Sequence, residues 1–258
     1  MPSLIKDRLQ QNQTVSVMSI STMATPKLVE AASYLSHVQG VWFDQEHCAL
    51  THSQIELLAM AARSGGLDCF TRVAPTDYGA VMRPMEAGCS GVMAAQVRTA
   101  EEVSQIVSWA KFAPQGGRGT FGANPESKYG IIPVAEYIEM ANRDRWLAIQ
   151  IETLSAVEQV DEIAAVEGVD LLFIGPNDLS VNLGVPGDML NPKCVAVLER
   201  VGQAAQKAGI AWGALCPTLE HARQCRDLGC QLFSLLGDTG CFRRGITALE
   251  ETFAEFFE

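Results

Sequence analysis

Eight short apolar segments alternate with segments of helical periodicity along this chain, and this alternation constrains its fold more than any other feature. The apolar segments span 15–20, 40–44, 68–73, 91–96, 147–152, 170–176, 210–216 and 232–238. Helical spacing is clearest over 53–65, 99–112, 155–168 and 191–209. Strands that alternate with helices predict a parallel sheet. Eight such units in 258 residues favour closure into a (β/α)8 barrel, which needs about 250 residues, as a single α/β domain over 1–258.

The ends of the helical segments carry recognisable signals. Ser53 with Glu56, and Thr99 with Glu102, have the spacing of a capping box, in which side chains bind the free amides at the start of a helix. Glycines stand where helices should stop, at Gly65, Gly168 and Gly209. No Gly-x-Gly-x-x-Gly follows the first apolar segment, so an open dinucleotide-binding sheet lacks its main sequence signal.

Charge and composition narrow the possible partners and the compartment. The net charge of −11 argues against nucleic acid, which needs clustered Lys and Arg, but it allows a small anionic substrate. The polar N-terminus is unlike a signal peptide, and no apolar run approaches the ~18 residues of a membrane span. The eight cysteines form no Cys-x-x-Cys pair, so we expect free, mostly buried thiols and a cytoplasmic protein.

One connection is longer than the others. Between 97 and 146 the sequence predicts a helix, a glycine-rich loop over 116–130 and a second short helix around 134–141. Loops of this length inside a compact domain are usually functional or disordered.

Active sites of (β/α)8 barrels form at the carboxyl ends of the strands, so the polar residues there are candidates for chemistry. They are Asp44 at the end of the second strand with Glu46 and His47 after it, Arg72 on the third, Gln150 and Glu152 on the fifth, and Asn177 and Asp178 after the sixth. Glu152 and Asp178 follow adjacent strands, so their carboxylates can converge on a hard cation such as Mg²⁺ or Mn²⁺. Each could instead cap the helix that follows it.

His47 is a candidate general base, because imidazole exchanges protons near neutral pH. Asp44, three residues earlier, could orient and charge-stabilise the imidazole. A single histidine in a loop is also compatible with a solvated surface residue. The other histidines are predicted to be structural or surface residues: His37 and His221 in presumed helices, and His52 beside the expected cap.

Arg72 ends an apolar strand, where a buried cation needs an anionic partner. Its guanidinium can hold a carboxylate or enolate oxygen in a fixed geometry, or form a salt bridge with Glu152 or Asp44. Schiff-base aldolases need a lysine on a barrel strand. None of the predicted strands contains one of the six lysines, Lys6, Lys27, Lys111, Lys128, Lys193 and Lys207. This distribution favours a metal ion as the electron sink.

Several of these segments resemble the HpcH/HpaI aldolase family, the metal-dependent class II pyruvate aldolases. The sharpest matches are FDQEH (43–47), similar to the family's Asp-x-Glu-His motif, and the long run over 150–184. Weaker matches are TRV (71–73), GCSGVMAAQVRTAEE (88–102) and APQGGRGTFG (113–122). The resemblance covers about 38 to 240, and the first forty residues match poorly.

The resemblance implies a (β/α)8 barrel, often a hexamer built from dimers that exchange the C-terminal helix. It implies Glu152 and Asp178 as ligands of Mg²⁺, Mn²⁺ or Co²⁺. Arg72 would hold the 2-oxo oxygen of pyruvate and stabilise its enolate. The loop over 116–130 would face the acceptor aldehyde, across a subunit interface.

The resemblance also assigns the remaining candidates. His47, supported by Asp44, would move the proton through a metal-bound or ordered water. Gln150 would line the site, and the backbone amides of Asn177 and Asp178 would receive the pyruvate carboxylate.

The implied reaction forms or cleaves a carbon–carbon bond between pyruvate and an aldehyde, on 4-hydroxy-2-oxo or 2-dehydro-3-deoxy acids. The same barrel could instead be a CoA-ester lyase of the citrate-lyase β type or an oxaloacetate decarboxylase. A CoA ester requires a basic patch for its phosphates, and only Arg243-Arg244 is visible. A non-catalytic barrel that binds a small acid is a third alternative.

The final segment, 245–258, carries Phe253, Phe256 and Phe257 on a predicted terminal helix. Aromatic side chains are costly to leave in water, so they pack on the chain's own barrel or on a neighbouring subunit. We expect the second arrangement, in a homo-oligomer that is a hexamer or a dimer.

Overall fold

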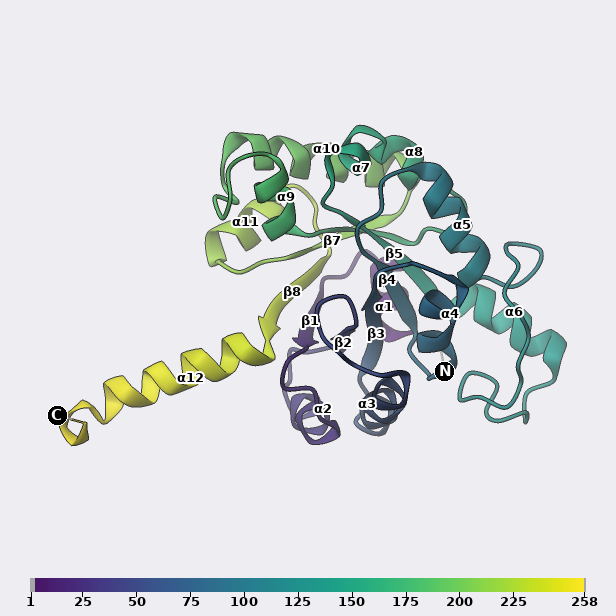
Figure 1. Cartoon of the computed structure of the whole chain (residues 1–258), viewed down its shortest axis with the longest axis horizontal. Coiled ribbons are helices and arrows are strands. Elements are labelled where there is room, and N and C mark those ends of the chain that lie inside the picture. The colour runs from purple at the N-terminus through teal and green to yellow at the C-terminus, as the bar shows by residue number, and fades with distance from the viewer. Residues whose placement is uncertain (1–2, 258) are drawn as a thin grey trace.

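Parallel strands close into a barrel in the computed structural model, which describes residues 3–257 (Figure 1). The strands are β1 (Val15–Ile20), β2 (Gly40–Asp44), β3 (Asp68–Val73), β4 (Gly91–Ala94), β5 (Trp146–Ile151), β6 (Leu171–Ile174), β7 (Ala211–Leu215) and β8 (Leu232–Gly237). Each strand pairs with its neighbour in sequence, and β8 pairs with β1. The predicted (β/α)8 barrel is therefore confirmed. Residues 1, 2 and 258 of the predicted domain lie outside the described residues.

All eight predicted strands are present, and the differences lie at their ends. β4 stops at Ala94, two residues before the predicted end, because Gln96 adopts a φ of 56° and leaves the sheet. β6 stops at Ile174 because Pro176 begins the next helix, and proline cannot donate to a sheet ladder.

Helices fill the connections between the strands. They are α1 (Leu4–Gln10), α2 (Pro26–Ser33), α3 (His52–Ser64), α4 (Tyr78–Glu86), α5 (Ala100–Ala110), α6 (Val134–Asp144), α7 (Leu154–Glu158), α8 (Val160–Ala164), α9 (Pro176–Asn182), α10 (Pro192–Ala208), α11 (Leu219–Asp227), α12 (Asp238–Thr252) and the short 3₁₀ helix η1 (Ala254–Phe256). The predicted helix over 155–168 is two short helices, α7 and α8, so Gly168 lies in a turn beyond them.

The structure confirms some of the predicted helix ends. Thr99 caps α5 by accepting from the amide of Glu102, but the carboxylate of Glu102 accepts from the amide of Arg98, so the predicted capping box is only half formed. Gly65 ends α3, and Gly209 ends α10 in the left-handed conformation. The capping box of α3 is formed by Thr51 with Gln54, so the prediction of Ser53 with Glu56 was wrong. The prediction of a helix at His37 was also wrong, because that residue lies in a turn.

Alternate strand residues point into the barrel and fill it. Trp42, Phe70, Met93, Trp146 and Phe173 belong to one buried cluster with Ile5 of α1. Ser3, which caps α1, accepts a hydrogen bond of 3.0 Å from the indole of Trp146, so α1 closes the amino end of the barrel. The intervening strand residues pack outward against the helices in two further clusters. Polar chemistry is thereby left to the carboxyl ends of the strands.

The thiols and the lysines lie as the sequence predicts. All eight cysteines are free, and six of them are buried. No lysine among residues 3–257 falls within a strand. None of the helices in this part of the chain combines the length and the apolar character needed to cross a membrane.

The end of the chain leaves the barrel. Helix α12 starts directly after β8 and extends away from the other helices (Figure 1). Phe253, Phe256 and Phe257 at its tip are 47%, 73% and 69% exposed, so they do not pack on the chain's own barrel.

Candidate active site

Glu152 is the most buried acidic residue at the carboxyl ends of the strands, with a side chain that is 0% exposed. It follows β5, and the pleat places it on the same face as Gln150, which points to the barrel axis. One carboxylate oxygen accepts a hydrogen bond of 2.9 Å from the amide of Gln96, and the other accepts one from the amide group of Gln150. Gly175 makes room for this pair, because a Cβ there would collide with both side chains.

The electrostatics around Glu152 favour a cation. Burial raises the pKa of this carboxyl to about 7, the charges of Glu46 and Asp178 add to the rise, and hydrogen bonds from Gln96 and Gln150 offset part of it. A buried carboxylate beside other carboxylates is costly without a positive charge to offset it. Within the described residues, Oε1 of Gln150 is buried without a hydrogen-bond partner. The oxygen donors here therefore fit a hard divalent ion and a polar ligand.

Asp178 and Asn177 lie in the first turn of α9, which starts at Pro176 directly after β6. The Asp178 side chain is half-buried and Asn177 is exposed. The amide of Asn182 donates a hydrogen bond of 2.8 Å to the backbone carbonyl of Glu152 and so ties α9 to the end of β5. Glu152 and Asp178 therefore lie at the same end of the barrel, and the charge of Asp178 contributes to the raised pKa of Glu152.

Arg72 and Asp44 form a two-pronged ion pair across β3 and β2. The distances are 2.7 Å from Nη2 to Oδ2 and 3.1 Å from Nε to Oδ1. Glu46 adds a second carboxylate, 3.3 Å from Nη1, and the guanidinium lies 5.1 Å from the ring centre of Trp42. Burial lowers the pKa of Arg72, but its bonds to Asp44 and the nearby carboxylates raise it above its usual value, so it stays charged.

His47 lies apart from this pair. Its side chain is 57% exposed, and Nε2 is 3.7 Å from Glu46 Oε2. The expected contact between Asp44 and the imidazole is not made, because Asp44 uses its oxygens for Arg72 and for the backbone amides of Glu46 and His47. The imidazole instead borders an open hollow of about 400 Å³, lined also by residues of the β1–α2 loop.

The hydrogen bonds and ion pairs of the glycine-rich loop over 116–130 involve none of the candidate residues described above. Its second half lines a cavity of about 530 Å³ together with residues that precede β3 and β4, at the amino ends of the strands. Buried Arg118 anchors the loop through a 2.6 Å ion pair with Glu126.

The chain is similar to known proteins over most of its length. A family model described as HpcH/HpaI aldolase/citrate lyase matches residues 18–244. This chain belongs to that family. The HpcH/HpaI model covers both the Asp44 to His47 motif and the run that contains Glu152 and Asp178.

Two curated members of the HpcH/HpaI family illustrate the similarity. A hydroxypyruvate/pyruvate aldolase of Paraburkholderia phytofirmans is 32% identical over 216 residues, which cover 81% of this chain and 82% of that protein. A 5-keto-4-deoxy-D-glucarate aldolase of Salmonella arizonae is 27% identical over 241 residues, or 93% of each chain. The prediction of a carbon–carbon lyase of the aldolase type is confirmed at this level.

Solved structures agree with the barrel. The crystal structure of an HpcH/HpaI aldolase from Desulfitobacterium hafniense has a TM-score of 0.89 at 28% identity and covers 97% of this chain and 98% of its own. A structure described as citrate synthase SbnG has a TM-score of 0.87 at 26% identity, with 99% of each chain covered. HpcH/HpaI enzymes act on small molecules with the help of a divalent metal ion.

Three residues of the site were given no role by sequence reasoning. Glu46 was named among the candidates without a role, although its place two residues after Asp44 puts it within reach of Arg72. Gln96 contributes its backbone amide, which no side-chain pattern reveals. Gly175 leaves space for Glu152 and Gln150 because it has no side chain. The only sequence signal for this role is a glycine at the end of an apolar segment.

Proposed function

We propose that this protein is a divalent-metal-dependent aldolase that joins pyruvate, as its enolate, to an aldehyde, or cleaves the product. Its substrates are 4-hydroxy-2-oxo or 2-dehydro-3-deoxy acids. The observation that carries the proposal is Glu152, a fully buried carboxylate held between Gln96 and Gln150 and influenced by the charge of Asp178. The names of the curated relatives support this substrate class.

Glu152 and Asp178 are the proposed metal ligands, and Mg²⁺, Mn²⁺ and Co²⁺ are the candidate ions. Their oxygens suit hard cations, and a bound cation would offset the burial that raises the pKa of Glu152. A bound ion supplies a Lewis acid that stabilises negative charge on the enolate oxygen.

Arg72 is proposed to hold the 2-oxo oxygen. The ion pair with Asp44 fixes the plane of the guanidinium, so the remaining N–H groups have a defined direction. Gln150, whose Oε1 is a free acceptor, is proposed to line the site. The backbone amides of Asn177 and Asp178 are proposed to donate hydrogen bonds to the pyruvate carboxylate.

His47 is proposed to move the proton through an ordered water. In the cleavage direction the 4-hydroxyl loses its proton, the bond between C3 and C4 breaks, and the pyruvate half leaves as an enolate that gains a proton at C3. The exposed imidazole can exchange this proton with solvent. Asp44 would support His47 only indirectly, through the backbone of the loop.

The test is pyruvate release from a panel of 4-hydroxy-2-oxo acids, read with lactate dehydrogenase, in Mg²⁺, Mn²⁺, Co²⁺ or EDTA. We expect release that needs the metal and disappears in Glu152→Ala, with His47→Ala slower but still able to bind metal. Release that persists in EDTA would contradict the metal mechanism.

A second candidate follows from the citrate synthase whose fold this chain shares. An oxaloacetate decarboxylase would form the same pyruvate enolate by release of CO2. A CoA-ester lyase would instead cleave a carbon–carbon bond to give the enolate of the CoA thioester and a carbonyl compound. Metal-dependent pyruvate release from oxaloacetate alone, without turnover of any 4-hydroxy-2-oxo acid, would favour this candidate.

We also propose an oligomeric state and a cellular compartment. The exposed aromatic tip of α12 supports a homo-oligomer, a hexamer or a dimer, in which this helix docks on a neighbouring subunit. The free cysteines support a reducing compartment, the cytoplasm.

A further inference from the structure

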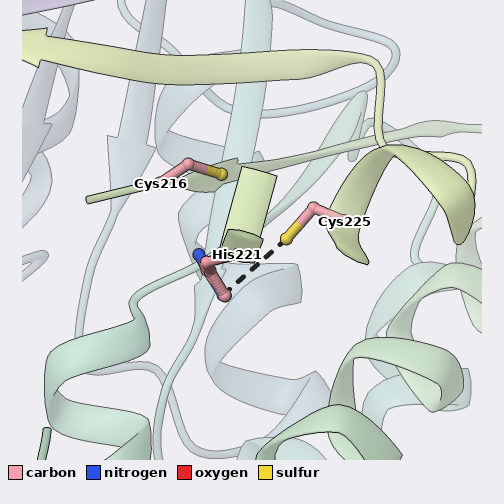
Figure 2. Close-up of side chains that lie close together, drawn as sticks. All are labelled: Cys216, His221 and Cys225. Atoms are coloured by element: carbon pink, nitrogen blue, oxygen red, sulfur yellow. Dashed lines mark hydrogen bonds between the residues drawn. The ribbon is translucent and has the colours of Figure 1, made fainter. Parts of the chain in front are cut away.

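Two cysteines and a histidine that have no role in the proposed aldolase chemistry lie together, one directly after β7 and two on α11. Cys216, His221 and Cys225 offer ligand atoms that all lie within 4.8 Å of one another (Figure 2). Nε2 of His221 is 3.7 Å from Sγ of Cys225. Among the described residues, no other group of three or more such side chains meets this criterion.

The local fold explains why these side chains converge. Along β7, Trp212 and Ala214 face the helices, and the same alternation directs Cys216 outward, to the layer between the barrel and α11. His221 and Cys225 are four residues apart on α11, one turn of the helix, and they are its buried residues. The strand and the helix thus present three ligands from opposite sides.

The cluster is enclosed and poorly supplied with hydrogen bonds. Cys216, His221 and Cys225 are 4%, 1% and 0% exposed. Nδ1 of His221 has no hydrogen-bond partner within residues 3–257, and a small apolar cavity lined by Pro176 and Leu179 adjoins the ring. The ring nitrogen that faces Cys225 is Nε2, so it is the atom available to a metal ion, and Nδ1 then carries the ring proton.

We propose that Cys216, His221 and Cys225 bind a thiolate-preferring divalent cation of the zinc type, separate from the ion at Glu152. Thiolate and imidazole ligands suit Zn²⁺, whereas the oxygen ligands at Glu152 suit harder ions. Binding releases two thiol protons to solvent, and Zn²⁺ with two thiolates and one neutral imidazole has no net charge. A neutral centre is compatible with the apolar cluster around it.

The geometry suits this ion. With Zn–S of about 2.3 Å and Zn–N of about 2.0–2.1 Å, tetrahedral coordination places sulfur and nitrogen about 3.6 Å apart. The separation of 3.7 Å between Cys225 and His221 is close to that value.

The test uses the whole protein produced in medium with Co²⁺ in place of Zn²⁺ and then dialysed against EDTA. EDTA strips an accessible ion at the active site, whereas an ion enclosed by Cys216, His221 and Cys225 stays. We expect about one Co²⁺ per chain after dialysis and a thiolate-to-cobalt charge-transfer band in the near ultraviolet. Wild-type protein without the band, or with Cys216 and Cys225 joined as a disulfide in mass spectrometry, would overturn the proposal.

Matched variants locate the ion. Cys216→Ser and Cys225→Ser should each lose the band and at least nine-tenths of the retained Co²⁺. Cys89→Ser, which changes an equally buried thiol in another cluster, should keep both. A band that survives in Cys225→Ser would also overturn the assignment. The wild-type spectrum keeps the test decisive even if a serine variant does not fold.

Discussion

Asp44 and Arg72 are paired in register on β2 and β3, and the carboxylate of Asp44 meets the guanidinium at 2.7 and 3.1 Å. The neighbouring Glu46 is 3.3 Å from the same guanidinium. Asp44 thus acts on the arginine rather than on the imidazole of His47. This relationship makes Asp44 a positioning residue. Its loss should displace the guanidinium of Arg72 from the 2-oxo oxygen that Arg72 is proposed to hold.

We expect Asp44→Asn to lower kcat/KM for pyruvate-forming cleavage by about 100-fold, because a misplacement near 1 Å of a positioning group costs on that order. The amide keeps the shape but cannot hold both nitrogens of Arg72. Steady-state kinetics of Asp44→Asn are compared with those of Arg72→Lys, because lysine keeps the positive charge but cannot form the two-pronged contact of a guanidinium. Unchanged kcat/KM in Asp44→Asn would show that the ion pair has no part in catalysis.

The raised pKa of Glu152 predicts how the metal-free protein responds to pH. Its folded pKa of about 7 lies above the ordinary 4.5, so the folded state holds this proton more tightly than the unfolded state. The associated stability is present below pH 4.5 and is lost as the pH rises to about 7. At about 1.4 kcal/mol per pKa unit, the loss is about 3 kcal/mol.

The measurement is urea unfolding in EDTA from pH 5 to pH 8, with Glu152→Gln as the matched control. The wild type should lose stability relative to the variant over this range, and a saturating divalent ion should reverse the loss. Parallel pH profiles of the two proteins would contradict the assigned environment of Glu152.

Gly175→Ala should damage the site by crowding it. A Cβ at this position collides with Glu152 and Gln150, whose neighbours leave them little room to move. We expect a destabilisation of about 1–3 kcal/mol and weaker metal binding, measured by thermal unfolding and by calorimetric titration with Mn²⁺. Gly122→Ala is the control, because a Cβ there meets no atom within 4 Å. Equal effects of the two substitutions would refute the steric argument.

The barrel could be predicted from the sequence because its signals are local. Alternating strands and helices, and caps such as Thr99, depend on a few adjacent residues, and they place Glu152 and Asp178 at one end without further information. The partner of Asp44 could not be settled in this way. His47 is near in sequence and Arg72 is 28 residues away, and only the register of β2 with β3 decides between them.

The cluster at Cys216 shows the same limit. The cysteines were correctly predicted to be free and buried, but their spacing matches no common metal motif. Their convergence with His221 depends on the packing of α11 against β7, which is a tertiary contact. Likewise, the contribution of Gln96 depends on one backbone amide turned by a left-handed φ of 56°.

Helix α12 provides the last prediction, because it buries little of its surface within its own chain. Its tip leaves Phe253, Phe256 and Phe257 about half to three-quarters exposed, and an apolar patch of this kind is a typical protein contact. We expect deletion of residues 248–258 to reduce the oligomer to a smaller species in multi-angle light scattering, with the barrel's circular dichroism retained. Tyr34→Ser, which removes a 79% exposed aromatic side chain at the end of α2, should leave the mass unchanged. An unchanged mass after the deletion would mean that α12 does not hold the subunits together.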